Sequence, residues 1–242
     1  MKTALITGST RGIGRALGLA LLRQGCAVAF HYRQDTQSAS NLEEELQREG
    51  FGGRFQIIQA DLSLPGGHDV LVDGLLPPFD NLDYLILNAA QTARGRLEEL
   101  SVERWEAVMR TNLTAPLFLT QRCAPRMRAQ GCVLFVGAVM GQYPHAMSIP
   151  YGVSKAGVHY LTRSLVKEFE MQAVRVNCVC PGFVETDWQK KKPTEIRESI
   201  ESKIALHRFA RAEEVAELCC SILNNTYMNG SVVNIDGGYC YR

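Results

Sequence analysis

Short, almost wholly apolar segments alternate with longer amphipathic ones along the whole chain, and this alternation constrains the fold more than any other feature. Residues 82–87 and 132–136 are examples of the apolar runs. Continuous apolar strands are typical of a parallel sheet that is covered on both faces. Strands that alternate with helices of this length predict a doubly wound α/β fold. We therefore expect a parallel sheet of about seven strands with helices on both faces.

The expected elements can be placed along the chain. Strands are expected at 2–7, 26–32, 55–60, 82–87, 132–136, 174–179 and 231–235. Helices are expected at 12–24, 38–49, 65–76, 151–171, 194–205 and 212–223. Ser101 should cap a further helix that runs toward Asn112, and Pro116 should kink the chain beyond it. Residues 183–192 are expected to form a mobile loop. With no internal linker or repeat, residues 1–242 are expected to form a single domain.

Composition and charge exclude several classes of protein. The chain carries 26 Lys and Arg against 25 Asp and Glu, so the basic excess of a nucleic-acid-binding protein is missing. No run of about 18 apolar residues is present, which argues against a membrane span. No secretory leader is recognisable at the start, so a cytoplasmic protein is expected. The eight cysteines are scattered and are expected to be buried, reduced thiols; no metal site is expected.

A glycine-rich segment, Thr7-Gly8-Ser9-Thr10-Arg11-Gly12-Ile13-Gly14, joins the first expected strand to the first expected helix. A tight turn here would let the backbone approach a pyrophosphate, and the amino-terminal end of the helix would face its negative charge. The spacing therefore predicts a Rossmann-like dinucleotide site. The residues expected to bind the cofactor here are Gly8, Ser9, Thr10, Arg11, Gly12, Ile13 and Gly14. The alternative is a glycine-rich turn that binds no ligand.

The end of the second expected strand indicates which dinucleotide is bound. NAD sites usually place Asp or Glu there, but this strand ends in His31-Tyr32-Arg33. Arg33 and Arg11 could together bind a 2′-phosphate, which favours NADP(H). The nearby Asp35 argues in the other direction, and Arg33 could instead be a solvated loop charge.

The end of the third expected strand supplies another candidate. Asp61, followed by Leu62, could accept a hydrogen bond from the adenine amino group. Asp61 could equally cap a turn, so both interpretations stay open.

The segment Tyr151-Gly152-Val153-Ser154-Lys155 opens the longest expected helix. Residues four apart lie on one helix face, so Tyr151 and Lys155 are expected to be neighbours. A lysine cation beside a phenol, together with a positive nicotinamide ring, favours the phenolate. Tyr151 is therefore a candidate proton donor in reduction and proton acceptor in oxidation. A tyrosine–lysine pair with this spacing is more often a surface pair, and only the upstream glycine motif changes that weighting.

Together these motifs resemble the short-chain dehydrogenase/reductase family from Thr3 to Gly238. The matching segments are Thr7–Gly14, Asp61, Asn88-Ala89-Ala90, Asn112, Tyr151 with Lys155, Pro181-Gly182, Thr186 and Asp236-Gly237-Gly238. Within the family, the chain is most similar to the 3-oxoacyl-acyl-carrier-protein reductases. The resemblance implies an NADPH-dependent oxidoreductase that reduces a ketone or an acyl thioester, possibly carried on an acyl carrier protein. It also implies a homotetramer.

The resemblance implies a role for each matching residue. Tyr151 looks like the catalytic acid/base, and Lys155 like the group that lowers its pKa and holds the nicotinamide ribose. Asn112 looks like the helix-kink residue that anchors a water in a proton relay. Asn88 and Ala89 look like neighbours of the adenine ribose. Pro181, Gly182, Val184 and Thr186 look like contacts of the nicotinamide end of the cofactor.

Two departures from the family pattern bear on activity. Ala90 stands where the family usually has glycine, and its methyl group would tighten the cofactor pocket. Ala138 stands thirteen residues before Tyr151, where the family has a catalytic serine, and alanine cannot donate to a carbonyl oxygen. Loss of one such donor typically costs about 10²–10³ in turnover. Ser148 and His145 are candidates for a replacement donor.

Three interpretations of the function therefore remain open. The first is an NADPH-dependent ketoreductase slowed by Ala138. The second is a protein that binds the cofactor but has lost efficient chemistry, against which the retained Asn112, Tyr151 and Lys155 argue. The third is an enzyme with altered chemistry, whose substrate supplies its own hydroxyl or acidic proton.

Overall fold

The computed structural model describes residues 1–144, 148–190 and 192–241. The strands are β1 (Thr3–Ile6), β2 (Ala27–Tyr32), β3 (Phe55–Gln59), β4 (Leu82–Leu87), β5 (Met127–Val136), β6 (Arg175–Pro181) and β7 (Val232–Ile235). The helices are α1 (Gly12–Arg23), α2 (Thr36–Arg48), α3 (Gly67–Asp73), α4 (Val102–Met109), α5 (Ala115–Cys123), α6 (Ile149–Glu168), α7 (Asp187–Lys190), α8 (Thr194–Glu201) and α9 (Ala212–Asn224). None of the described helices is both long and apolar enough to cross a membrane.

The described strands form one seven-stranded sheet in the order β3-β2-β1-β4-β5-β6-β7, and every neighbouring pair is parallel. The chain winds outward from β1 to β3 and then returns to place β4 on the other side of β1. This reversal creates a switch point between β1 and β4, where doubly wound sheets usually bind ligands. The expected α/β fold, with its seven-stranded sheet, is thus confirmed.

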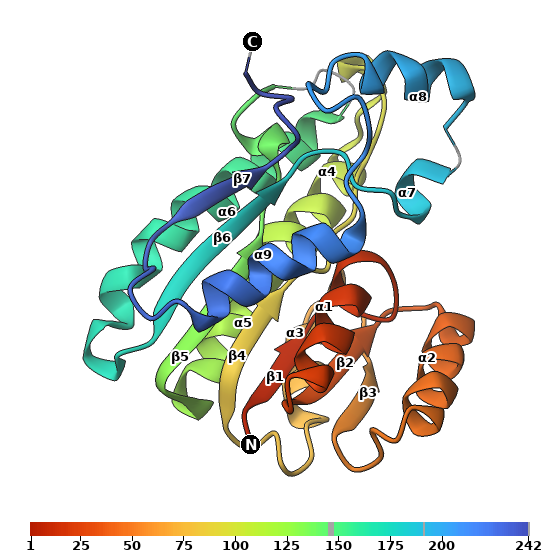
Figure 1. Ribbon diagram of the computed structural model, residues 1–242. Coiled ribbons are helices and arrows are strands. Elements are labelled where there is room, and N and C mark those ends of the chain that lie inside the picture. The colour runs from red at the N-terminus through yellow and green to blue at the C-terminus, as the bar shows by residue number, and fades with distance from the viewer. Residues whose placement is uncertain (145–147, 191, 242) are drawn as a thin grey trace.

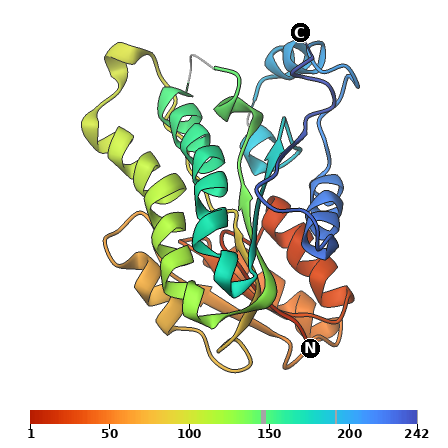
Figure 2. The ribbon, with the colours of Figure 1, turned by 90° about the vertical axis from the view of Figure 1, so that its left-hand side faces the viewer.

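Two apolar layers enclose the sheet. On one face, α1, α2 and α9 bury residues such as Leu17, Leu42 and Val215 against the strands. On the other face, α3, α5 and α6 bury Leu71, Leu119 and their neighbours. Figure 1 shows α1 and α9 in front of the sheet and α5 and α6 behind it, and Figure 2 shows the sheet on edge between these layers. Burial on both faces explains why the strands are apolar at nearly every position.

Several element boundaries differ from those expected. β5 begins at Met127 and not at Cys132, because Met127 pairs with Leu82 of β4 before a register shift that precedes the pair of Cys132 with Tyr84. α6 begins at Ile149, so Tyr151 lies in its first turn. The segment expected to be a loop contains α7, and Val184 in it forms an isolated parallel bridge with Ala210.

The helix expected to run from Ser101 toward Asn112 changes its winding before it ends. Ser101 caps α4 as expected, since its Oγ accepts a hydrogen bond from the Arg104 amide at 3.3 Å. A π-helical turn, η2 (Arg110–Thr114), then joins α4 to α5. Pro116 lies in the first turn of α5, where a missing N–H is tolerated. The expected kink is therefore a widened turn centred on Asn112.

Candidate active site

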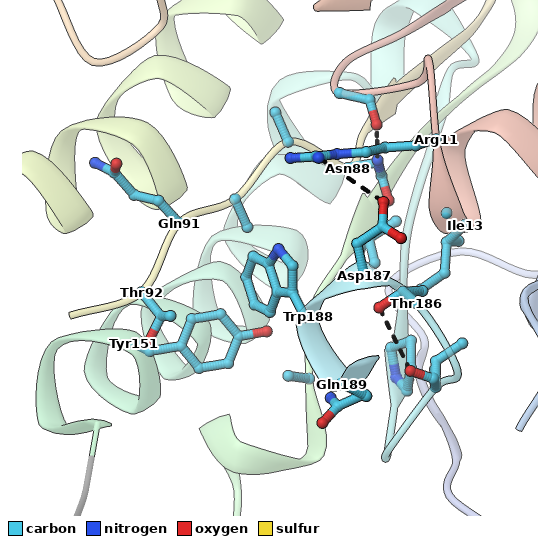
Figure 3. Close-up of a pocket in the computed structure, with 18 of the residues that line it drawn as sticks. Arg11, Ile13, Asn88, Gln91, Thr92, Tyr151, Thr186, Asp187, Trp188 and Gln189 are labelled. Atoms are coloured by element: carbon cyan, nitrogen blue, oxygen red, sulfur yellow. Dashed lines mark hydrogen bonds and ion pairs between the residues drawn. The ribbon is translucent and has the colours of Figure 1, made fainter. Parts of the chain in front are cut away.

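A cleft of about 990 Å³ lies at the carboxyl ends of the strands, over the β1–β4 switch point. Most of the predicted site residues line it: Gly8, Thr10, Arg11, Gly12, Ile13, Arg33, Leu62, Asn88, Ala89, Tyr151, Lys155, Pro181, Gly182, Val184 and Thr186. The lining does not include four others: Ser9, Gly14, Asp61 and Asn112. Figure 3 shows Arg11, Asn88, Tyr151 and Thr186 around the cleft. One cavity therefore unites the glycine-rich turn with the tyrosine–lysine pair.

The glycine-rich turn depends on conformations that side chains would strain. Gly8 and Gly12 have φ values of 60° and 57°, in the left-handed region that favours glycine. A Cβ on Gly8 would lie 2.9 Å from the Ala89 Cα, so the turn could not approach β4. A Cβ on Gly14 would lie 2.7 Å from the Asn88 Nδ2. Gly14 thus permits close packing behind the cleft, while the free N–H groups of the first turn of α1 face it.

Two buried polar residues hold this turn in place. His31 accepts a hydrogen bond from the Gly8 amide at its Nδ1, 2.9 Å away, and its Nε2 lies 3.0 Å from the Ala60 carbonyl oxygen. This arrangement requires a neutral imidazole with the proton on Nε2. Burial lowers the pKa of His31 to about 4, which maintains that form. Ser9 donates to the Ile6 carbonyl and accepts from the His31 amide. Ser9 is therefore a bracing residue of the turn.

Asn88 and Thr7 join the turn to β4. The Asn88 side chain donates to the carbonyl oxygens of Thr7 and Gly8 at 2.9 and 2.8 Å. The Thr7 hydroxyl oxygen in turn accepts from the backbone amides of Asn88 and Ala89. The asparagine thus fixes the separation of the two strands at the switch point.

The two candidate phosphate-binding arginines differ in their partners. Arg11 forms ion pairs with Asp35 at 3.3 Å and with Asp187 at 3.8 Å, all on exposed side chains. Asp35 caps α2, and its hydrogen bonds from Ser38 lower the pKa of its carboxyl group. Among the described residues, Arg33 forms hydrogen bonds with neutral groups alone, the amide oxygens of Gln34 and Gln91, at 3.2 and 3.4 Å. Asp35 therefore engages Arg11, and the Arg33 charge stays available at the cleft.

Asp61 adopts the turn geometry that was one of its two open interpretations. Its Oδ1 accepts hydrogen bonds from the Ser63 amide at 2.8 Å and from the Ser63 hydroxyl at 2.6 Å. Burial acts to raise the pKa of Asp61, but these bonds and the charge of Arg33 outweigh it, so the net shift is downward. The neighbours Leu62 and Ser63 face the cleft.

Tyr151 and Lys155 lie one turn apart in α6. The Lys155 ammonium lies 5.7 Å from the centre of the Tyr151 ring and donates to the Val136 carbonyl oxygen at 2.6 Å. Burial lowers the pKa of Lys155 to about 8, although the neighbouring thiols of Cys178 and Cys180 act to raise it. Burial also raises the pKa of the Tyr151 phenol. The net shift in the pKa of Tyr151 therefore opposes the phenolate that Lys155 was expected to favour.

A cluster of one histidine and two cysteines lies near Lys155. His159 Nε2 is 3.0 Å from the Cys180 Sγ, which is 3.7 Å from the Cys178 Sγ. All three residues are buried, and their potential ligand atoms lie within 4.8 Å of one another. Burial, followed by the charge of Lys155, lowers the pKa of His159 to about 4. In the sequence only Cys178 and Cys180 lie close together, and the fold brings His159 next to them. The eight cysteines are all free, and seven of them are buried, as expected.

Asn112 lies in η2, and its side-chain amide is bonded to residues of two other segments. Its Oδ1 accepts from the Gln91 amide at 2.8 Å, and its Nδ2 donates to the Gln91 carbonyl at 2.9 Å and to the Ser154 Oγ at 3.0 Å. Only 1% of its surface is exposed. Asn112 therefore connects three segments: η2, in which it lies, the loop that follows β4, and α6.

The position of Ala138 bears on proton donation in the cleft. Ala138 lines the cleft together with Tyr151, after β5. Ser148 also lines it, but its Oγ lies 2.5 Å from the Thr92 Oγ1 and donates to the Ala93 carbonyl at 3.4 Å. His145, the other candidate for a replacement donor, lies outside the described residues.

Sequence reasoning missed two cleft residues on α7. The Trp188 indole packs edge-on against the Tyr151 ring, with 5.9 Å between ring centres. Gln189 lines the same cleft and is 9% exposed. Both residues closely follow Thr186, which matches the family pattern, and this position could have indicated that they belong to the site. They were missed because residues 183–192 were expected to form a mobile loop.

Comparisons with known proteins agree with this architecture. A family model described as short chain dehydrogenase matches residues 2–197. The 3-oxoacyl-acyl-carrier-protein reductase FabG of Thermotoga maritima is 33% identical over 242 residues, which cover 98% of this chain and 97% of the relative. The uncharacterized oxidoreductase YmfI of Bacillus subtilis is 28% identical, with 98% of each chain covered.

Solved structures with the same fold include proteins that hold a dinucleotide. The angucycline C-6 ketoreductase LanV with bound NADP superposes with a TM-score of 0.93 at 28% identity, covering 100% of this chain and 96% of LanV. A short chain dehydrogenase from Burkholderia cenocepacia J2315 in complex with NADP gives a TM-score of 0.91 at 28% identity, covering 98% of this chain and 97% of that protein.

Proposed function

The chain belongs to the short chain dehydrogenase family of oxidoreductases, and from that premise we propose that it is an NADPH-dependent reductase of ketones. One observation carries the proposal: a single cleft contains both the glycine-rich turn and the Tyr151–Lys155 pair. The family acts on alcohol and carbonyl groups. The proposal adds three things to this family activity: the direction of reduction, the preference for NADPH and the substrate class.

The residues of the cleft fit a dinucleotide. A pyrophosphate would lie against the turn of Gly8–Ile13, where glycines leave space and the α1 amino terminus faces the cleft. Arg33 would bind the 2′-phosphate, since it forms no ion pair with the described residues. Asn88, Ala89 and Leu62 would lie along the adenosine. Pro181, Gly182, Val184 and Thr186 would contact the nicotinamide end. When bound, the cofactor supplies the hydride.

Tyr151 would protonate the ketone oxygen. Because burial raises its pKa, the phenol keeps its proton at neutral pH, as a proton donor in reduction must. Below its pKa of about 8, Lys155 carries a positive charge one helical turn away. That charge would stabilise the phenolate left after the proton transfer. The protonation states of Tyr151 and Lys155 therefore support the direction of reduction.

The mouth of the cleft favours an anionic substrate. Arg94, Lys192 and Lys203 line it, and burial followed by the charge of Arg94 lowers the pKa of Lys192. Such a mouth suits the phosphate of a thioester carrier, so a 3-oxoacyl thioester, free or on an acyl carrier protein, is the proposed substrate class. Lys191, the neighbour of Lys192 in sequence, lies outside the described residues.

A second candidate function rests on Ala138. A protein that keeps the cofactor site but lacks a serine hydroxyl beside Tyr151 could bind NADPH without efficient turnover. The tyrosine–lysine pair in the cleft argues for retained chemistry.

One assay separates the candidates. NADPH oxidation would be measured with acetoacetyl-N-acetylcysteamine and a ketone panel, for the native chain and for Ala138→Ser. Turnover by the native chain that rises with the serine supports the slowed reductase. NADPH binding without turnover in either form would support the second candidate. Turnover that falls on adding the serine would indicate altered chemistry.

A further inference from the structure

We propose that the side-chain amide of Gln189 donates a hydrogen bond to the oxygen of the reacting ketone, the contact that Ala138 cannot make. The inference rests on the proposed reductase function and identifies a further catalytic residue for it. Gln189, Ala138 and Tyr151 line one cleft although they come from α7, the end of β5 and α6.

The Gln189 amide has no partner within the described part of the protein. Its Oε1 is sealed from solvent without a hydrogen bond, and no described residue bonds its Nε2. Only 9% of the residue is exposed. Buried amides normally satisfy their hydrogen-bonding capacity, so one left free at a cleft requires an explanation. No hydrogen bond to a described residue has to be broken for the N–H groups of this amide to bond to a ligand in the cleft.

The backbone places this amide on the Tyr151 side of the cleft. The Gln189 backbone amide donates to the Thr186 carbonyl at 2.8 Å, and the Val184–Ala210 bridge anchors the start of the segment to the fold. Trp188, next to Gln189, packs against the Tyr151 ring. In Figure 3 the Tyr151 hydroxyl points toward the segment that carries Trp188, and the Gln189 side chain extends back toward the Tyr151 side.

Ser148, the other candidate donor in the described part of the cleft, already has hydrogen-bond partners. The hydroxyls of Ser148 and Thr92 lie 2.5 Å apart, and Ser148 also has the Ala93 carbonyl as an acceptor. A hydroxyl of Ser148 or Thr92 would have to break its hydrogen bond to a protein oxygen before it could donate to the substrate. The Gln189 amide has no such competitor among the described residues, which is why the assignment falls on it.

A double-mutant cycle tests the assignment. Gln189→Met keeps the length of the side chain and removes both donors. With acetoacetyl-N-acetylcysteamine, kcat should fall about 10²-fold in Gln189→Met while the Kd for NADPH stays unchanged. Ala138→Ser should restore most of that loss in the Gln189→Met background but change the native chain only a few-fold. A Gln189→Met variant with native kcat, or the same serine effect in both backgrounds, would overturn the proposal.

The matched control is Gln172→Met, which removes an exposed glutamine between α6 and β6, outside the cleft. Its kcat and melting temperature should equal those of the native chain. Gln189→Met should share that melting temperature, which would exclude a folding defect as the cause of its lower kcat. If Gln189→Met melts lower, an infrared comparison on the folded protein decides.

This infrared measurement does not depend on turnover. The ketone carbonyl band of ¹³C-labelled acetoacetyl-N-acetylcysteamine would be recorded on each form saturated with NADP⁺, which cannot reduce it. A hydrogen bond from Gln189 lowers this frequency, so the band should move higher in Gln189→Met. Equal frequencies would overturn the proposal. If no form oxidises NADPH, the reductase function fails, and the infrared comparison still decides the role of Gln189.

Discussion

Burial acts on both members of the proposed catalytic pair, Tyr151 and Lys155, and in each case it favours the neutral form. It raises the pKa of Tyr151 and lowers the pKa of Lys155 to about 8. A neutral phenol is the form that protonates a ketone oxygen, so the environment of Tyr151 suits reduction. Lys155 has the opposite requirement, because only its cation stabilises the phenolate. The titration of Lys155 is therefore expected to limit activity at alkaline pH.

We expect kcat for ketone reduction to be level near pH 7 and to fall about tenfold per pH unit above pH 8, as Lys155 loses its proton. Unfolding should not cause this loss. Because the folded pKa of Lys155 lies below the ordinary lysine value of 10.5, the unfolded chain binds more protons between these two values, and this group makes stability rise with pH there. Melting temperatures recorded alongside kcat separate the two effects. A kcat that stays level to pH 10 would contradict the prediction.

Arg33→Ala tests the dinucleotide preference at a single charge. The guanidinium forms no ion pair with the described residues, so its charge is available for a 2′-phosphate. Loss of a charged hydrogen bond should raise the Kd for NADPH about 10–100-fold. The Kd for NADH should stay constant, since NADH lacks that phosphate. Titration calorimetry measures both, with Arg23→Ala, an exposed arginine paired with Glu49 at 3.3 Å, as control. Equal weakening of both dinucleotides would contradict the prediction.

At the scale of elements, the site depends on a junction of three segments. The π-helical turn η2 presents the Asn112 amide to the loop after β4 and to α6. The same contacts position the loop whose residues Asn88 and Ala89 meet the glycine-rich turn. A wide turn in the helix thus sets the distance between the cofactor half and the catalytic half of the cleft.

Asn112→Ala should destabilise the fold through this junction. The substitution removes three hydrogen bonds, one buried and two part-buried, and takes these partners from the backbone amide and carbonyl of Gln91. We expect a loss of about 2–4 kcal/mol in the free energy of unfolding. The melting temperature should fall by roughly 5–12 °C for a chain of this length. Asn41→Ala, which removes an exposed asparagine on α2 bonded to Gln37, is the control. A melting temperature within about 1 °C of native would contradict this junction role.

At the scale of the whole molecule, one face carries apolar side chains that its own fold leaves uncovered. Leu117 and Phe118 on α5 are 36% and 38% exposed, and Val153 and Tyr160 on α6 are 45% and 75% exposed. Both helices cover the same face of the sheet (Figure 2). Apolar residues on neighbouring outer helices indicate an interface between copies of the chain.

We therefore expect a homotetramer, with four times the 26.9 kDa mass of the chain. The double substitution Phe118→Glu with Tyr160→Glu should dissociate it into smaller species, because burying two carboxylates at the interface is costly. Sedimentation velocity measures the masses. Leu64→Glu replaces an exposed leucine outside both helices and should leave the assembly intact. A native chain that sediments as a monomer would contradict the prediction.

The sequence by itself determined the fold class, the glycine-rich turn and the tyrosine–lysine pair. Each of these features depends on residues that lie close together in the sequence. Strand and helix periods repeat within a few residues, Gly8 and Gly12 act through their own backbone angles, and Tyr151 and Lys155 share one helical turn. Local geometry is enough to fix such features, so pattern and spacing could predict them.

Only the tertiary structure decided the surroundings of these groups. The pKa of Lys155 depends on burial and on thiols from β6, and the free amide of Gln189 depends on α7 folding over the cleft. Asn112 is buried because Gln91 and Ser154, distant in the sequence, satisfy the hydrogen bonds of its side-chain amide. Desolvation and hydrogen-bond satisfaction are set by atoms brought together from distant parts of the chain, and no local pattern in the sequence contains that information.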